Sequence, residues 1–281
     1  MLTKETNDRL TRTDRGTMGG EMMRRYWQPV ALSEELISGA APLPVKIMGE
    51  EMVLFRDDED RISLLDRHCC HRGSDISYGR MEDGELRYLY HGWLFDVDGK
   101  CVEQPAEPPG STFKDKVRQR AYPCIERAGA IFAYMGPGDP PLLPDYQFPT
   151  APDGHVHMNK LYQQCNYLQG NESNIDPTHT EYVHRPLVDM DVPNETSSES
   201  REDPQGSYTA HWHVPIDDYS HWRSNSNIST TGRWTAPITG ASPISNWAMI
   251  SASSAILPTA TCKTGSLRKT ITSRAWGIGS R

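Results

Sequence analysis

The chain has 281 residues, a formal net charge of −8 at pH 7 and a mean hydropathy of −0.64. No apolar run approaches the roughly 18 residues of a transmembrane helix, and the acidic balance argues against a general nucleic-acid binder. Residues 1–25 carry mixed charges without the apolar core of a secretory signal, so we expect a cytoplasmic location. In that reducing compartment the six cysteines and ten histidines favour metal binding over disulfides.

The first part of the chain predicts an N-terminal arm, residues 1–25, and an antiparallel β domain, residues 26–137. Short apolar runs bounded by Gly, Asp and Pro are typical of strands, and they occur at 44–48, 52–55, 62–65, 86–90 and 130–134. The dipeptide Asp98-Gly99 predicts a tight hairpin turn. A Pro-rich segment, residues 138–150, is expected to link this domain to the next.

A second domain is predicted from residue 151 to residue 223. It opens with a strand-like stretch at 156–161, continues into a helical region from 163 to about 184 that is expected to break near Gly170, and returns to a strand at 207–216. This order of elements predicts a mixed helix and sheet domain.

Two short segments in the β domain combine residues that bind metals. The first contains Cys69 and His71, and the second runs from Tyr88 to His91. Loops present such ligands without leaving buried backbone groups unpaired, so both segments are candidate metal-binding loops.

This pattern resembles the Rieske iron–sulfur motif, Cys-x-His followed by Cys-x-x-His. In that motif two cysteines bind one iron of a [2Fe–2S] cluster and two histidines bind the other. The resemblance implies that Cys69, His71 and His91 are cluster ligands. The second cysteine is expected at position 88, where this sequence has Tyr88. A phenol cannot replace a cluster thiolate without changing the affinity of the protein for the cluster and the reduction potential of the cluster. We therefore expect this chain to bind the cluster weakly or not at all.

Two other uses of these residues stay open. Cys70 or Cys101 could supply the missing thiolate, although neither has the expected spacing. Alternatively, a zinc ion could be bound by the run His68, Cys69, Cys70 and His71. The chain would then be a zinc-stabilised binding module.

A second candidate metal site has the pattern Asp-x-x-His-x4-His, at Asp176, His179 and His184. Asp176 followed by Pro177 predicts a helix that starts with an acidic cap. His179 would share a helix face with Asp176, whereas His184 lies about 140° further around the axis. Joint ligation by the two histidines therefore needs a helix end or a local bulge. Polar packing is the alternative for such a pair.

Together the two motifs resemble the Rieske non-haem iron oxygenases, in the branch similar to phthalate 4,5-dioxygenase. Segments 89–99, 103–108 and 133–137 are also family-like. The resemblance implies an α+β protein. An N-terminal antiparallel β Rieske [2Fe–2S] domain would be followed by an incomplete α+β catalytic domain with a helix-grip-like antiparallel sheet.

The same resemblance implies roles for the second motif. His179 and His184 would bind a mononuclear Fe(II), and Asp176 would bridge electron transfer from the cluster, across a subunit interface in family members. The third iron ligand is a carboxylate from later in the chain. Nothing in the sequence places the available candidates, which are Asp189, Asp191, Asp217 and Asp218.

The implied activity is oxygenation of an aromatic small molecule. Electrons would pass from NAD(P)H through a separate flavin/iron–sulfur reductase to the cluster and then to Fe(II). The iron would activate O2 for mono- or dioxygenation or for O-demethylation. The assembly in the family is a homotrimer. An electron-transfer Rieske protein without catalysis is the alternative, and the second motif argues against it.

The last segment, residues 224–281, has an abnormal composition. All 37 acidic residues precede it, and it carries six basic residues. A solvated low-complexity tail is one interpretation. A frameshift is the other, because a back-translation read one base earlier gives an ordinary protein-like sequence. We therefore expect the catalytic domain to be truncated and the iron site to lack its third ligand.

Overall fold

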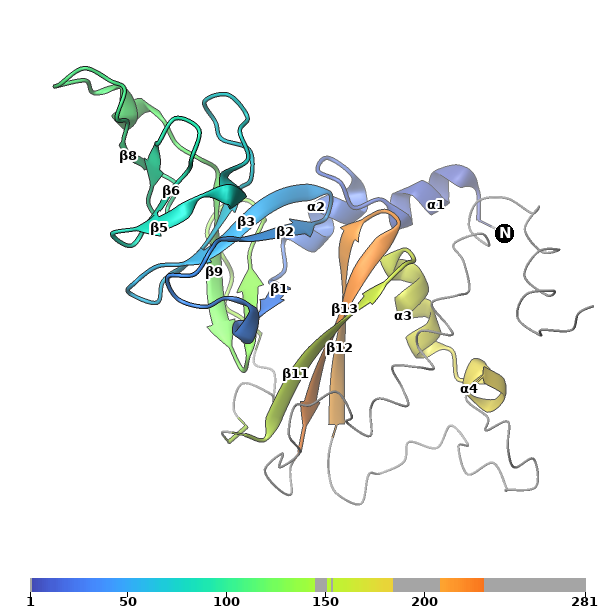
Figure 1. The fold of residues 1–281 in the computed structure, drawn as a ribbon. Coiled ribbons are helices and arrows are strands. Elements are labelled where there is room, and N and C mark those ends of the chain that lie inside the picture. The colour runs from blue at the N-terminus through green and yellow to red at the C-terminus, as the bar shows by residue number, and fades with distance from the viewer. Residues whose placement is uncertain (1, 145–150, 153, 184–207, 230–281) are drawn as a thin grey trace, which may run out of the picture.

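The computed structural model describes residues 2–144, 151–152, 154–183 and 208–229 (Figure 1). The 26–137 region forms two antiparallel sheets, and residues 156–228 contribute a third. Within the described ranges, no helix combines the length and apolar character needed to span a membrane. The predicted α+β class, with an antiparallel β domain first, is confirmed.

The larger sheet of the first domain has six strands in the order β1-β10-β9-β4-β3-β2. They are β1 (Gln28–Leu32), β2 (Leu43–Ile47), β3 (Glu50–Arg56), β4 (Ile62–Asp66), β9 (Ala121–Arg127) and β10 (Ala130–Ala133). The smaller sheet has the order β5-β6-β7-β8. Its strands are β5 (Arg80–Glu82), β6 (Glu85–Arg87), β7 (Leu94–Phe95) and β8 (Cys101–Glu103). The smaller sheet lies at the end of the molecule away from the third sheet (Figure 1).

The predicted strand at 86–90 is wrong in its second half. β6 ends at Arg87, and the chain then turns so that the Tyr88 N–H donates to the Trp93 carbonyl at 3.1 Å. Gly92 has a φ of +71°, a conformation that side chains with a Cβ rarely adopt. The apolar run therefore supplies a loop here. The predicted turn at Asp98-Gly99 is confirmed between β7 and β8.

The N-terminal arm forms two helices, α1 (Lys4–Thr11) and α2 (Met18–Arg24). Arg24 is buried and pairs with Glu50 of β3 at 2.8 Å, and it also donates to the Met48 carbonyl. A buried cation needs such partners to offset its lost hydration. The second helix is thereby fixed to the larger sheet.

The third sheet has the order β11-β13-β12. It consists of β11 (Val156–Gln163), β12 (Tyr208–Asp217) and β13 (Ser220–Ile228). β13 continues past the predicted domain boundary at residue 223. Backbone N–H groups of Met48 and Gly49 donate to the Pro215 and Ile216 carbonyls at 2.8 and 2.9 Å, which joins this sheet to the first domain.

The helical region contains α3 (Tyr167–Ile175) and α4 (Thr178–Val183). The expected break near Gly170 is wrong, because α3 runs through that residue. The break falls at Asp176 and Pro177 instead, since proline cannot donate the hydrogen bond that would continue the first helix. Asp176 Oδ1 accepts from the Thr178 N–H at 2.9 Å, as expected for a residue that caps the second helix.

The two faces of the third sheet differ in character. Met158, Val214 and Ile228 are buried against the first domain, where they join its hydrophobic cores. The side chains that alternate with them belong to the opposite face, which packs against α3 through β12 and β13. This opposite face, which we call the polar face, carries His211, His213, His221, Arg223 and Asn225.

Candidate metal centres

Two loops at the small sheet bring the predicted cluster residues together. Cys69 follows β4 and is buried, and its N–H donates to the Ser74 carbonyl while its carbonyl accepts from Gly73 at 2.8 Å. Gly73 has a φ of +71°, which allows this tight turn. The second loop, after β6, contains Tyr88 and His91. Below both loops lies a core that includes Phe55, Leu65, Ile76, Leu86 and Phe95.

The two histidines of the motif face each other. The Nδ1 atoms of His71 and His91 are 3.1 Å apart, and their ring centroids are 4.5 Å apart. The His71 ring also stacks on Trp93, with centroids 4.4 Å apart and planes within 7°. Burial first, and then the neighbouring His91, lower the pKa of His71, which favours the neutral imidazole that binds metals.

Tyr88 occupies the expected position of the second cysteine. Its side chain is 1% exposed, and its hydroxyl lies 2.8 Å from Nδ1 of His91. Burial and the hydrogen bond with Cys69 raise the pKa of the phenol. A neutral phenol thus contacts the nitrogen and the thiol that would otherwise face the cluster.

Cys69 is the thiol best prepared to act as a ligand. Its pKa is lowered to about 6, chiefly by a hydrogen bond from Cys70, with further hydrogen bonds from the His71 backbone and Tyr88. The Cys101 thiol is buried in the same core, and burial raises its pKa to about 11. Cys70 is exposed, and hydrogen bonding to Cys69 raises its pKa.

The donor set fits a [2Fe–2S] cluster at three positions and not at the fourth. Cys69, His71 and His91 supply one thiol of lowered pKa and two facing imidazoles, whereas position 88 supplies a protonated phenol. In the part of the chain that the structure describes, no three His, Cys, Asp or Glu side chains group closely enough to hold a metal ion. The zinc alternative gains no support, because His68 bonds to Glu51 at 2.9 Å and to the Gly73 carbonyl.

The second motif is described only in part. Asp176 and His179 lie close together at the α3–α4 turn, where Oδ2 of Asp176 is 3.7 Å from Nδ1 of His179. His184, Asp189 and Asp191 lie outside the described residues, as do residues 230–281. Of the remaining candidate carboxylates, Asp217 pairs with Lys46 and Asp218 with Arg12, both at the turn between β12 and β13.

The polar face holds functional candidates that the sequence reading missed. His213 Nδ1 lies 2.9 Å from His221 Nε2, and Asn174 Nδ2 lies 2.7 Å from His213 Nε2. Burial lowers the pKa of His213 to about 3 and also lowers the pKa of His221. The alternation His211-x-His213 within a predicted strand was the available signal, because it places both imidazoles on one face.

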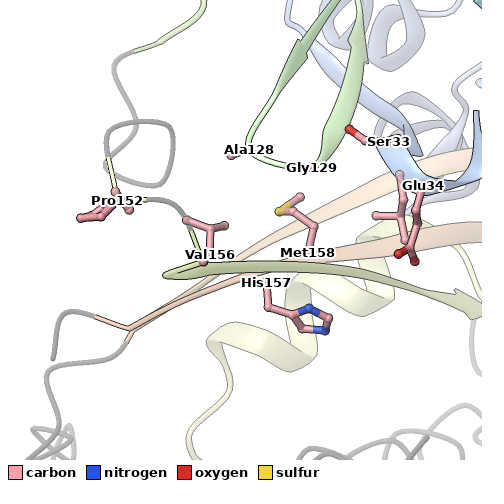
Figure 2. A pocket seen from close by; sticks show the side chains of 11 residues that line it. Ser33, Glu34, Ala128, Gly129, Pro152, Val156, His157 and Met158 are labelled. Atoms are coloured by element: carbon pink, nitrogen blue, oxygen red, sulfur yellow. The ribbon is translucent and has the colours of Figure 1, made fainter. Parts of the chain in front are cut away.

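A pocket of about 430 Å³ lies elsewhere, at the junction of the two domains (Figure 2). Ser33 and Glu34, the β9–β10 turn at Gly129, and Met158 of β11 line it. His157 also belongs to the lining, although its ring lies on the opposite side of β11 from Met158 (Figure 2). Its lining combines apolar side chains such as Val156 and Met158 with the polar residues Ser33, Glu34 and His157, and it includes no residue of either metal motif.

Comparisons with known proteins agree with this arrangement. Residues 26–123 match the Rieske [2Fe-2S] domain family. The 5,5'-dehydrodivanillate O-demethylase oxygenase subunit of Sphingobium sp. (strain NBRC 103272 / SYK-6) is 43% identical over 187 residues, which cover 66% of this chain and 44% of that protein. The phthalate 4,5-dioxygenase oxygenase subunit of Pseudomonas putida is 41% identical over 188 residues, which cover 66% of this chain and 42% of that protein.

The fold also matches solved structures. Dicamba monooxygenase with non-heme iron and dicamba superposes with a TM-score of 0.67 at 20% identity, over 92% of this chain and 91% of that chain. The family match over residues 26–123 identifies the N-terminal β domain as a Rieske domain, the kind of domain that binds a [2Fe–2S] cluster. Residues 26–123 belong to the Rieske [2Fe-2S] domain family, and the chain is similar to oxygenase subunits of Rieske non-haem iron oxygenases, among them that of phthalate 4,5-dioxygenase. It spans about half the length of the curated relatives that it matches.

Proposed function

We propose that this chain is part of the oxygenase component of a Rieske mono- or dioxygenase that acts on an aromatic compound. One observation carries the proposal. Two loops at one end of a Rieske fold present Cys69, His71 and His91 together, and the attached sheet and helices carry the Asp176 and His179 motif. The named relatives act in O-demethylation and ring dioxygenation, which supports the reaction class.

The bound groups would supply electron storage at the cluster and O2 activation at Fe(II). For electron delivery we propose a separate reductase fed by NAD(P)H. Solved oxygenase–ferredoxin complexes of carbazole 1,9a-dioxygenase share this fold, which supports an iron–sulfur partner. A homotrimer is proposed for the assembly, with Asp176 at the interface that links the two metal sites.

The role of each described residue follows from its position. Cys69 would bind one cluster iron, and His71 and His91 would bind the other. Trp93 holds the His71 ring by stacking. Tyr88 fills the fourth ligand position without supplying a thiolate, so the oxygenase scaffold in this chain carries an incomplete cluster site.

The test is to restore the missing ligand. Tyr88→Cys and the unchanged protein are reconstituted anaerobically with iron and sulfide, and iron, acid-labile sulfide and visible absorption are measured per chain. We expect about two irons and two sulfides in Tyr88→Cys, as a Rieske cluster requires, and a clearly smaller content in the unchanged protein.

The matched control is Tyr90→Cys, which adds a thiol to the same loop at an exposed residue. It should bind no more cluster than the unchanged protein. A full cluster in the protein with Tyr88 would overturn the assignment of position 88, and an unloaded Tyr88→Cys would overturn the assignment of the loops as a Rieske site.

A further inference from the structure

We propose that His213 and His221 form a directed hydrogen-bond chain that fixes the end of α3, so that Asn174 and His213 are positioning residues for Asp176 and His179. The roles of Asp176 and His179 rest on the proposed function. The chain itself is assigned from the geometry of the polar face.

The chain has four members in series. His221 Nδ1 lies 2.8 Å from the Cys165 carbonyl, and His221 Nε2 lies 2.9 Å from His213 Nδ1. His213 Nε2 in turn lies 2.7 Å from Asn174 Nδ2. Both ring nitrogens of each histidine are therefore engaged, and His221 is fully buried.

The two ends of the chain fix the direction of every bond. A carbonyl only accepts, so His221 must carry its proton on Nδ1 and accept at Nε2. His213 must then donate from Nδ1 and accept at Nε2. An amide nitrogen only donates, which matches Asn174 Nδ2 at the last position. Two neutral Nδ1–H imidazoles satisfy all three bonds, whereas a second proton on either ring would remove an acceptor.

This arrangement serves position rather than proton transfer. The chain ends on the Cys165 carbonyl, which cannot take up a proton, so no proton can be delivered along it. Burial lowers the pKa of both histidines, in agreement with neutral rings. The hydrogen bonds instead hold the end of α3 at a fixed position relative to β12 and β13.

Gly170 allows the helix to approach the chain. A Cβ at this residue would lie 2.4 Å from His213 Nδ1 and 2.8 Å from His221 Nε2. Asn174 is one turn further along α3, and Asp176 ends the helix two residues later. The bond from Asn174 to His213 thus restrains the segment that carries Asp176 and turns into α4 with His179.

The test uses nuclear magnetic resonance of the full chain with ¹⁵N-labelled histidine. We expect both imidazoles as neutral Nδ1–H tautomers between about pH 5 and 7, a range in which an ordinary histidine titrates. A coupling through the hydrogen bond should connect His213 Nδ1 with His221 Nε2. A proton on Nε2 of His213, or titration of either ring in that range, would contradict the proposed hydrogen-bond arrangement.

The positioning role is tested with Asn174→Ala and the matched control Asn171→Ala. Both residues are exposed on α3, so neither change threatens the fold. Asn174→Ala should shift the His213 Nε2 signal, the Asp176 amide signal and the His179 ring signals, and Asn171→Ala should leave them in place. Unmoved Asp176 and His179 signals in Asn174→Ala would contradict the proposal. This readout needs no cluster or iron, so it fails or succeeds independently of the oxygenase assignment.

Discussion

Tyr88 completes a hydrophobic core at the position where the proposed cluster site would need a second cysteine. Its ring packs beside Phe95 and its hydroxyl bonds to His91 Nδ1. A buried donor without a partner is costly, and the Tyr88 hydroxyl has one in His91. This hydrogen bond therefore stabilises the two loops in the absence of a bound cluster. The sequence alone showed the mismatch of residue type but not this contact, because it depends on where the second loop folds.

Removing only the hydroxyl tests that account. Tyr88→Phe should lower the free energy of unfolding by about 1 kcal/mol, the usual net worth of a buried hydrogen bond. Tyr90→Phe is the control, because Tyr90 is 71% exposed, and it should change little. Urea unfolding of the three proteins measures the difference. Equal stabilities for Tyr88→Phe and the unchanged protein would mean that the bond contributes nothing.

Asp75, which follows the loop that carries Cys69 and His71, makes the stability of the fold depend on pH. Burial raises the pKa of Asp75, but hydrogen bonds from Arg67 and Ser77 outweigh it and bring the value to about 2, below the ordinary 3.8. A carboxyl group with a lowered folded pKa stabilises the fold above its unfolded pKa, and this contribution is lost as the pH falls from about 4 to 2. Urea midpoints should therefore fall across that window, and less steeply in Asp75→Asn. A slope identical to that of the unchanged protein would refute this.

At the scale of elements, α3 is set by its contact with the polar face rather than by helix propensity. Gly170→Ala would ordinarily stabilise a helix by about 1 kcal/mol. Here the added Cβ meets His213 and His221, so we expect a net loss of about 2 kcal/mol from overpacking. Asn171→Ala serves as the propensity control and should be neutral or slightly stabilising. A gain in stability for Gly170→Ala, measured by thermal unfolding, would show that α3 does not pack against the histidines as described.

The comparison of sequence and structure is also clearest for elements. Apolar runs located β3, β4 and β10 well, because consecutive residues of these strands are buried and a strand buried on both faces is written as a continuous apolar run. The run at 86–90 misled, because only its first half is paired in β6 and the chain then turns, leaving Leu89 and Tyr90 exposed in a loop. Gly170 misled in the opposite way, as its role is close approach of two elements. The alternation His211-x-His213 indicated imidazoles on one face of a strand, but the bonds of His213 to His221 and Asn174 could not be predicted, because they depend on the pairing of β12 with β13 and on where α3 packs.

At the scale of the whole molecule, the two metal motifs lack different ligands. The proposed cluster site has Tyr88 where a second thiolate is expected. The described part of the iron motif shows Asp176 and His179 but brings no further His, Cys, Asp or Glu group to them. Asp217 and Asp218 are held by Lys46 and Arg12 at the junction with the first domain. Residues 224–281 contain no acidic residue that could supply the third ligand.

We therefore expect Tyr88→Cys to recover the cluster without recovering oxygenation. Electrons would reach the cluster, but an iron centre without its carboxylate ligand should not support turnover. The measurement is a single turnover with chemically reduced Tyr88→Cys, Fe(II), O2 and phthalate or 5,5'-dehydrodivanillate, the compounds named for two relatives. Reoxidation of the cluster without hydroxylated or demethylated product is the expected result. Product formed in proportion to cluster oxidised would show that a carboxylate outside the described residues completes the iron site.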